Sequence, residues 1–316
     1  MKNDLTRRAF LTGTAVTAGL TLAAAPVAPA QDAPPRFQKG VSPWPICMNV
    51  STIRPANVKT KIDATAKAGW DAIELWITDL EAHEKDGGSL KDLGKEIVDR
   101  GMFVPNIIGL WECMPMDDDA FKKSLEATRE RMRRSAEVGS HFVAAIPAPD
   151  GPDFDAKTAT ARYRELMRIG REDYNIKVAF EFVGFMKSVN RLGQASGIAM
   201  DTDDREACLI ADTFHMFRGG SGFNGLKHIQ GDFIADFHWN DVKDEVPREQ
   251  QGDEHRVYPG DGVLPLGQAL RDLKAIGYKR TLSLEIFKKE YWAMDPYEVA
   301  VTGLAKMVEC VAKSGV

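Results

Sequence analysis

The fold is decided by a pattern first met in Val178-Ala179-Phe180-Glu181-Phe182, a short apolar run that carries one acidic residue. The pattern returns in Leu209-Ile210-Ala211-Asp212, in Ile234-Ala235-Asp236-Phe237-His238 and in Leu282-Ser283-Leu284-Glu285. Apolar runs of this length are typical of parallel strands buried on both faces. A charged side chain in such a strand is costly unless it is paired, protonated or bound to a metal. Four such strands in succession therefore indicate one shared polar centre.

Working outward, eight strand candidates alternate with helical stretches. We expect strands at residues 46–50, 71–76, 103–110, 141–148, 177–183, 208–213, 234–241 and 281–287, and helices at 56–68, 117–138, 266–276 and 296–312. Gly69, Gly139 and Gly277 each follow a predicted helix and precede a strand, as is usual where a helix leads into a strand. Alternation implies parallel pairing with right-handed crossovers, and eight units predict a single (β/α)8 TIM barrel.

Two connections are longer than such a barrel needs, at residues 184–206 and 242–263. Both leave the carboxyl ends of predicted strands, where the active sites of these barrels lie. Long loops in this place are usually lids or binding loops. The first predicted strand is followed by no glycine-rich nucleotide loop, which argues against an open doubly wound sheet.

The N-terminus has the features of an export signal. Thr6-Arg7-Arg8-Ala9-Phe10-Leu11 is a twin-arginine pattern, an apolar run follows it, and Ala28-Pro29-Ala30 is a small-residue cleavage site. We therefore expect residues 1–30 to be a cleavable signal and residues 31–316 to form the barrel, exported to the periplasm without stable membrane insertion. Twin-arginine export moves folded proteins, so a weakly binding metal is inserted before copper or zinc competes for its site.

Composition excludes several classes of partner. The 41 basic and 46 acidic residues nearly balance and form no polybasic block, so nucleic acid and anionic membranes are not expected as partners. The four cysteines lie far apart without a C-x-x-C pair, which argues against a structural zinc knot. Scattered buried thiols are expected, with one disulfide and a homo-oligomer left open.

The polar centre predicts a metal site held by Glu181, Asp212, His238 and Glu285. Successive members are separated by about one strand-and-helix unit, and neighbouring strands of a small barrel converge. Three carboxylates and one imidazole favour one divalent ion, Mn²⁺ first, with Mg²⁺, Co²⁺ and Zn²⁺ as alternatives. A network of salt bridges at the barrel mouth is the alternative that needs no metal.

Three segments carry a resemblance to a known family. They are Gly69-Trp70-Asp71-Ala72-Ile73-Glu74-Leu75, Asp212-Thr213-Phe214-His215-Met216 and Arg256-Val257-Tyr258-Pro259-Gly260-Asp261-Gly262. The chain resembles the xylose-isomerase-like sugar isomerase and epimerase superfamily over essentially its whole mature length. The resemblance implies that Glu181, Asp212, His238 and Glu285 bind the metal. It also implies that Glu181 and Glu285 move protons on opposite faces of a keto-sugar, through a metal-stabilised enediolate.

The same resemblance places His215 and Arg256 on substrate oxygens. Glu74 ends the second predicted strand and is expected either to meet substrate hydroxyls or to have a structural role. Trp111, like Trp76, is expected either to stack on a sugar face or to pack at the barrel mouth.

Departures from the family pattern leave the substrate open. Ketose 3-epimerases often carry a further acid after the strand-five glutamate, whereas this chain reads Phe182-Val183-Gly184-Phe185-Met186-Lys187. This leaves a lyase that cleaves 3-keto-glycosides by β-elimination as one alternative and a non-catalytic sugar-binding barrel as another. The endonuclease branch of the superfamily is disfavoured, because its additional early histidines are missing.

Overall fold

The computed structural model describes residues 37–147 and 154–316, so the predicted export signal lies outside the described residues. Eight parallel strands close into a barrel in the order β1-β10-β7-β6-β5-β4-β3-β2. These strands are β1 (Ile46–Asn49), β2 (Ala72–Trp76), β3 (Asn106–Leu110), β4 (Phe142–Ala145), β5 (Lys177–Glu181), β6 (Leu209–Asp212), β7 (Ile234–Trp239) and β10 (Leu282–Leu284). The predicted TIM barrel is confirmed, and each strand falls within its predicted range.

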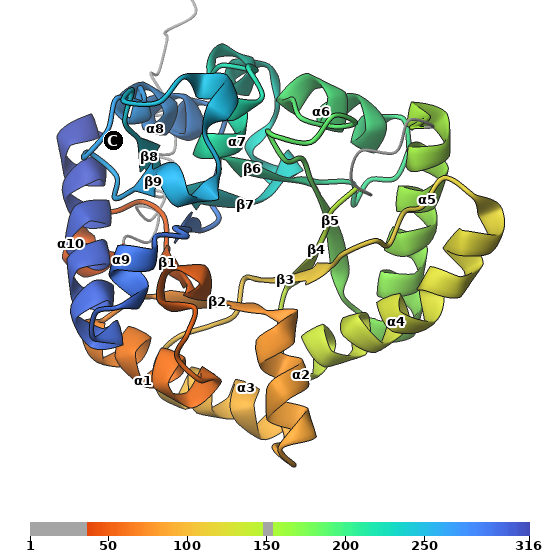
Figure 1. Cartoon of the computed structure of the whole chain (residues 1–316), viewed down its shortest axis with the longest axis horizontal. Helices are drawn as coiled ribbons and strands as arrows, with labels where there is room; N and C mark the ends of the chain where they lie inside the picture. The colour runs from red at the N-terminus through yellow and green to blue at the C-terminus, as the bar shows by residue number, and fades with distance from the viewer. Residues whose placement is uncertain (1–36, 148–153) are drawn as a thin grey trace, which may run out of the picture. The chain divides into compact units, whose positions relative to one another are not determined.

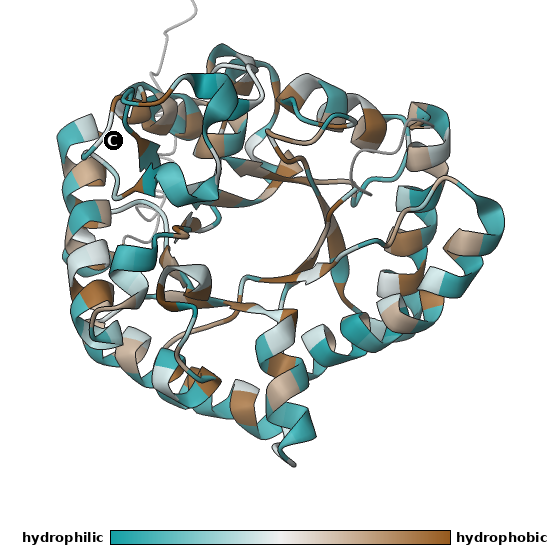
Figure 2. Cartoon of the chain, in the orientation of Figure 1, coloured by the Kyte–Doolittle hydropathy of each residue, from teal (hydrophilic) through white to brown (hydrophobic). Residues whose placement is uncertain are grey.

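Helices form a ring outside the strands (Figure 1). They are α1 (Val58–Ala68), α2 (Ile77–Lys85), α3 (Leu90–Asp99), α4 (Asp118–Glu137), α5 (Ala156–Ile169), α6 (Leu192–Met200), α7 (Thr213–Arg218), α8 (Leu266–Ala275), α9 (Lys289–Trp292) and α10 (Pro296–Ser314). Figure 2 shows the hydrophobic residues gathered on the strands and on the helix faces turned toward them. The core thus lies within the barrel and in the layer between barrel and helices.

Local sequence signals set the helix boundaries. Asn57 caps α1 by accepting from the Thr60 amide, and Asp295 caps α10, whose first residue is a proline. Gly69 ends α1 in the left-handed conformation at φ 90°, which a residue with a Cβ atom adopts at a cost. The predicted glycine stop before the second strand is therefore confirmed.

The two long connections contain more structure than the sequence predicts. Residues 184–206 include α6, although its two glycines lower the intrinsic helix propensity; burial of Leu192 and Ile198 overrides that preference. Residues 242–263 include part of a short antiparallel pair, β8 (Asp241–Val242) with β9 (Arg256–Val257). This pair fixes Arg256 at the edge of the barrel.

The cysteines and the hydropathy of the helices add two findings. All four cysteines are free thiols, and Cys47, Cys113 and Cys208 are buried, as predicted. In residues 37–147 and 154–316, every helix is too short or too polar to span a membrane.

Candidate metal centre and active-site cavity

The carboxyl ends of four strands bring the predicted metal ligands together. Asp212 is the last residue of β6 and lies opposite His238 of β7 in the parallel register. Ser283 of β10 also lies opposite His238, and Glu285 follows two residues later, so it points to the same side of the sheet. Glu181 is the last residue of β5. Barrel closure thus converts four separated sequence positions into one cluster.

The Nδ1 atom of His238 is the centre of this cluster. It lies 3.2 Å from Glu181 Oε1, 3.2 Å from Glu285 Oε2 and 3.6 Å from Asp212 Oδ2. One ligand atom from each of Glu181, His238 and Glu285 falls within 4.8 Å of the others. All four residues are buried, with relative exposures of 3% or less.

These residues fit a single divalent cation. Glu181 Oε2 and His238 Nδ1 are buried, and neither makes a hydrogen bond within the described part of the chain. Such atoms cost free energy unless something binds them. Carboxylate oxygens with one imidazole nitrogen suit manganese, magnesium, cobalt or a catalytic zinc ion. The donor set and the unpartnered atoms therefore agree with the predicted metal site.

Arg256 reaches into the same cluster from β9. Its Nη1 lies 2.7 Å from Asp212 Oδ2 and 2.8 Å from Glu285 Oε2, while Nε and Nη2 donate to Asp253 Oδ1. The side chain is only 1% exposed. The guanidinium therefore neutralises two of the predicted metal ligands. A direct contact with substrate, as expected from the resemblance, requires it to release at least one of these pairs.

Burial and charge shift the protonation of the cluster in opposite directions. Burial raises the pKa of Glu181 to about 7, even though His238 lies beside it. Burial alone would lower the pKa of His238, but Glu285, Glu74 and Glu181 outweigh it and raise that pKa well above the usual value. The metal-free cluster consequently stores protons that a bound cation would displace.

A cavity of about 410 Å³ opens over the cluster, which is within the usual size range for small-molecule sites. Its floor includes Glu181, Glu285, Arg256 and His215. Its wall is largely apolar and aromatic, with Arg54 beside it: Trp76, Ile108, Trp111, Ile146, Val183, Phe185, Met186 and Phe287. Four of the chain's predicted site residues therefore share this floor, and Trp111 lies in its wall.

His215 and Trp111 occupy defined positions in the cavity. Burial, the largest cause, lowers the pKa of His215 to about 4, so its imidazole is neutral near pH 7. Its Nε2 lies 3.2 Å from Arg256 Nη2, which can only donate, and its buried Nδ1 has no hydrogen-bond partner among the described residues. Nδ1 therefore carries the proton. Trp111 stacks on Trp76 with ring centroids 5.8 Å apart.

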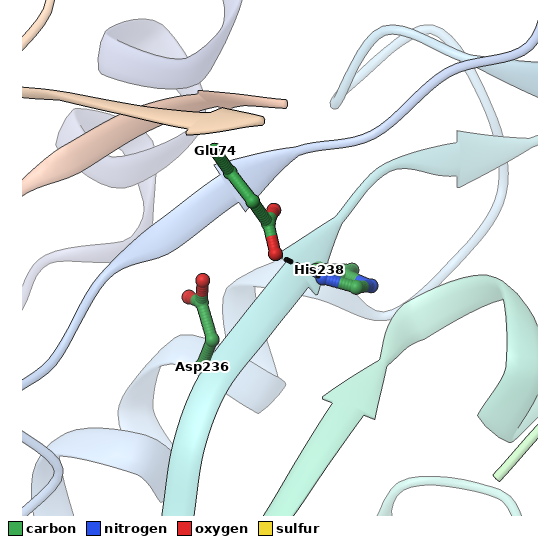
Figure 3. Close-up of side chains that lie close together, drawn as sticks. All are labelled: Glu74, Asp236 and His238. Carbon is green, nitrogen blue, oxygen red and sulfur yellow. Dashed lines mark hydrogen bonds and ion pairs between the residues drawn. The ribbon is translucent and has the colours of Figure 1, made fainter. Parts of the chain in front are cut away.

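Glu74 lies outside the cavity, where it cannot contact a substrate. It has no exposed area and does not line the cavity; its Oε1 lies 3.0 Å from His238 Nε2 (Figure 3). Glu181, Asp212 and Glu285 instead face Nδ1, the other ring nitrogen. Of the two roles expected for Glu74, this placement favours the structural one. Asp236 is a buried neighbour that sequence reasoning did not single out. The sequence does contain a signal for it: Asp236 lies two residues before His238, so both side chains face the same side of β7.

The chain belongs to the family described as Xylose isomerase-like TIM barrel, whose model matches residues 62–310. It is similar to inosose isomerases, with 29% identity to the one from Bacillus subtilis and 28% to the one from Bacillus licheniformis. Each alignment covers 85% of this chain and 98% of the relative. A 3-dehydroshikimate dehydratase from Pseudomonas putida is 21% identical, over 78% of this chain and 39% of that longer protein.

Solved structures agree with this assignment. A crystal structure of the IolI protein with a bound zinc atom is 27% identical, has a TM-score of 0.77, and covers 85% of this chain and 99% of its own. An L-ribulose 3-epimerase, 19% identical with a TM-score of 0.69 over 86% of this chain and 95% of that one, shares the fold.

Proposed function

We propose that this chain is a metal-dependent isomerase or epimerase that transfers a proton at a carbon next to the carbonyl of a sugar-like substrate. One observation carries the proposal: the carboxylates of Glu181 and Glu285 meet His238 Nδ1 on the floor of the cavity. The inosose isomerase relatives, aligned over nearly their whole length, support the same reaction class.

The two glutamates divide the acid and base work. A general base operates best when its pKa is near the working pH, and burial brings the pKa of Glu181 to about 7. Glu285 lies on a different strand end and accepts from Asn49 Nδ2 at 3.1 Å, which orients its carboxylate. A proton removed by one glutamate can be returned by the other at the second carbon or on the second face. A divalent cation held by these residues would supply Lewis-acid polarisation of the substrate carbonyl.

His215 and Arg256 orient the substrate. The neutral His215 imidazole lines the cavity, and its Nδ1 proton, which has no partner among the described residues, would donate to a substrate oxygen. Arg256 supplies a guanidinium beside Glu285, close to where negative charge develops during proton transfer. The aromatic wall with Trp111 excludes water and offers an apolar face to the sugar ring.

We also propose Mn²⁺ as the native metal and a periplasmic location. The carboxylate-rich donor set supports manganese over zinc, which favours thiolate and histidine in structural sites. The location rests on the sequence Thr6-Arg7-Arg8-Ala9-Phe10-Leu11 and on the small-residue site that ends at Ala30. N-terminal sequencing of protein secreted by a host with and without a working twin-arginine pathway tests the location.

The decisive experiment measures solvent deuterium exchange into a panel of keto-sugars and inososes with Mn²⁺-loaded protein. We expect exchange with at least one panel member, and a loss of about 10²-fold or more in Glu285→Gln. Asp212→Ala should lose bound metal as well as activity. Tyr163→Phe is the matched control, because Tyr163 is buried and hydrogen-bonded at the opposite strand ends, on the Val178 and Cys208 carbonyls.

Two results would overturn these assignments. Absence of both exchange and elimination across the panel would remove the enzyme proposal and leave a sugar-binding barrel. An unchanged metal content in Asp212→Ala would remove the metal site.

Elimination is the second candidate reaction. The dehydratase relative favours it, because loss of a group β to a carbonyl begins with the same proton removal. The same panel, extended with 3-keto-glycosides, distinguishes the two: isomerisation gives a product of equal mass, whereas a lyase acting on a 3-keto-glycoside releases the second sugar.

A further inference from the structure

The carboxylate of Glu74 is surrounded by hydrogen-bonding side chains from four strands, β1, β3, β7 and β10. Its Oε1 accepts from Asn106 Nδ2 at 2.7 Å and faces His238 Nε2 at 3.0 Å. Its Oε2 accepts from Asn49 Nδ2 at 2.8 Å and from the Ser283 hydroxyl at 2.5 Å. We call Asn49, Glu74, Asn106 and Ser283 the support cluster; all four are completely buried.

These contacts suit an ionised Glu74. A carboxylate offers about four lone-pair directions, and Glu74 makes four such contacts. The Asn49 amide presents an N–H group, which cannot accept a proton from an acid, because its oxygen already accepts from Trp76 and Ser51. With Glu74 ionised, the hydrogen in its contact with His238 belongs to Nε2.

The same contacts argue against a second cation beneath the first. Ligand atoms of Glu74, Asp236 and His238 lie within 4.8 Å of one another, a spacing compatible with a metal (Figure 3). However, Glu74 has no free lone pair for it, and His238 Nε2 carries a hydrogen. Asp236 Oδ1 accepts from the Thr281 hydroxyl and the Phe237 amide, so apart from His238 Nδ1 at the first site, the buried Asp236 Oδ2 is the one acceptor atom of the three side chains without a partner among the described residues. The lower group thus supports the metal centre rather than forming another.

We propose that Glu74 is a positioning residue: it holds the His238 imidazole with its proton on Nε2 and so presents the Nδ1 lone pair to the metal. Nδ1 is the nitrogen that faces Glu181, Glu285 and Asp212. A carboxylate behind a metal-bound imidazole fixes both the ring orientation and the tautomer. This inference rests on the metal centre of the proposed function and is independent of the sugar chemistry.

The support cluster also reaches a second ligand. The Asn49 amide nitrogen donates both to Glu74 and to Glu285 Oε1, at 3.1 Å in the latter case. Its amide oxygen accepts from Trp76 Nε1 and from the Ser51 amide, which settles the orientation of the side chain. Because one amide bridges the two carboxylates, Glu74 is coupled to the placement of Glu285 as well as His238.

The first test is the affinity for Mn²⁺ of full-length Glu74→Gln, measured by competition with a chelator. Glutamine removes the charge and replaces one acceptor oxygen with an NH₂ group. That NH₂ group would face the N–H or O–H groups that now donate to Glu74, and the imidazole would lose its fixed partner. We expect binding to weaken by about 10- to 100-fold. Tyr163→Phe loses buried hydrogen bonds of comparable kind far from the metal, and we expect its Mn²⁺ affinity to stay within about twofold of wild type.

The second test needs no variant and remains valid if Glu74→Gln fails to fold. In the Zn²⁺-loaded wild-type protein, ¹⁵N NMR of the histidine side chains should show His238 with its proton on Nε2 and the metal on Nδ1. The opposite tautomer, or Mn²⁺ affinity in Glu74→Gln equal to wild type, would overturn the inference. Failure of the deuterium-exchange assay with the expected tautomer present would instead count against the proposed reaction alone.

Discussion

Removing the guanidinium of Arg256 should lower the stability of the metal-free protein and raise its affinity for metal. Arg256 bridges Asp212 and Glu285 at 2.7 and 2.8 Å, and its side chain is almost completely buried. In the Arg256→Gln variant, two buried carboxylates lose their cationic partner. The metal-free protein then holds excess negative charge at the floor of the barrel, and a divalent cation becomes its natural replacement.

The structure sets the expected magnitudes. Breaking a buried ion pair by removing one partner costs about 3–5 kcal/mol, and 1% exposure leaves little solvent to screen this loss. Metal binding should recover much of the loss. The cation no longer has to displace a guanidinium from two ligands, so its affinity should rise by roughly 5- to 150-fold, the range for coupling energies of about 1–3 kcal/mol.

Thermal melts with Mn²⁺ and with EDTA, combined with a chelator competition, measure both effects. The gap between the two melting temperatures should be wider in Arg256→Gln than in wild type. Arg248→Gln is the control, because Arg248 pairs with Glu249 on the exposed surface, where a pair contributes about 0–1 kcal/mol. Wild-type stability in EDTA together with unchanged Mn²⁺ affinity would refute the idea that the guanidinium compensates these carboxylates.

Three further outcomes follow from burial and packing. Because burial raises the pKa of metal-free Glu181 to about 7, protons compete with the cation below that pH. Titration calorimetry at several pH values should show that the affinity for Mn²⁺ rises toward neutral pH and that binding releases protons. An affinity that stays constant from pH 5 to 7 would contradict this. Burial raises the pKa of Cys113 and of Cys208 to about 12, so neither thiol should react with a disulfide reagent at pH 8 until the chain unfolds, as mass spectrometry of labelled peptides would show. A Cβ atom at Gly94 would lie 2.3 Å from a backbone carbonyl oxygen, so Gly94→Ala should destabilise the fold by about 1–3 kcal/mol in denaturant melts, whereas Gly193→Ala in α6, with open space around it, should be neutral or stabilising.

The sequence was sufficient for the barrel and for the gathering of Glu181, Asp212, His238 and Glu285 at one polar centre. The apolar runs that carry Glu181, Asp212 and His238 at or next to their last residue are local signals, and parallel pairing brings these ends to one edge of the sheet. Glycine stops such as Gly69 also act locally, through one backbone angle.

What the sequence did not predict depends on side chains meeting across the barrel. Glu74 and His238 are far apart in the chain and come from β2 and β7, so only the closed barrel shows that one lies behind the other. The pairing of Arg256 with Asp212 depends on the β8–β9 hairpin, whose two-residue strands are too short to leave a periodic pattern. Helix α6 was missed because tertiary burial, rather than propensity, stabilises its glycine-containing sequence.

The distribution of the cavity residues along the chain has a practical meaning for protein engineering. All the predicted metal ligands come from β5, β6, β7 and the end of β10, whereas Trp76, Ile108, Trp111 and Ile146 of the cavity wall belong to β2, β3, β4 and the residues directly after them. These four wall residues are therefore encoded in the first half of the gene and the metal ligands in the second, which also encodes the rest of the wall at Val183, Phe185, Met186 and Phe287. Saturation libraries at Ile108, Trp111 and Ile146 would vary the accepted sugar while every metal-binding codon stays fixed.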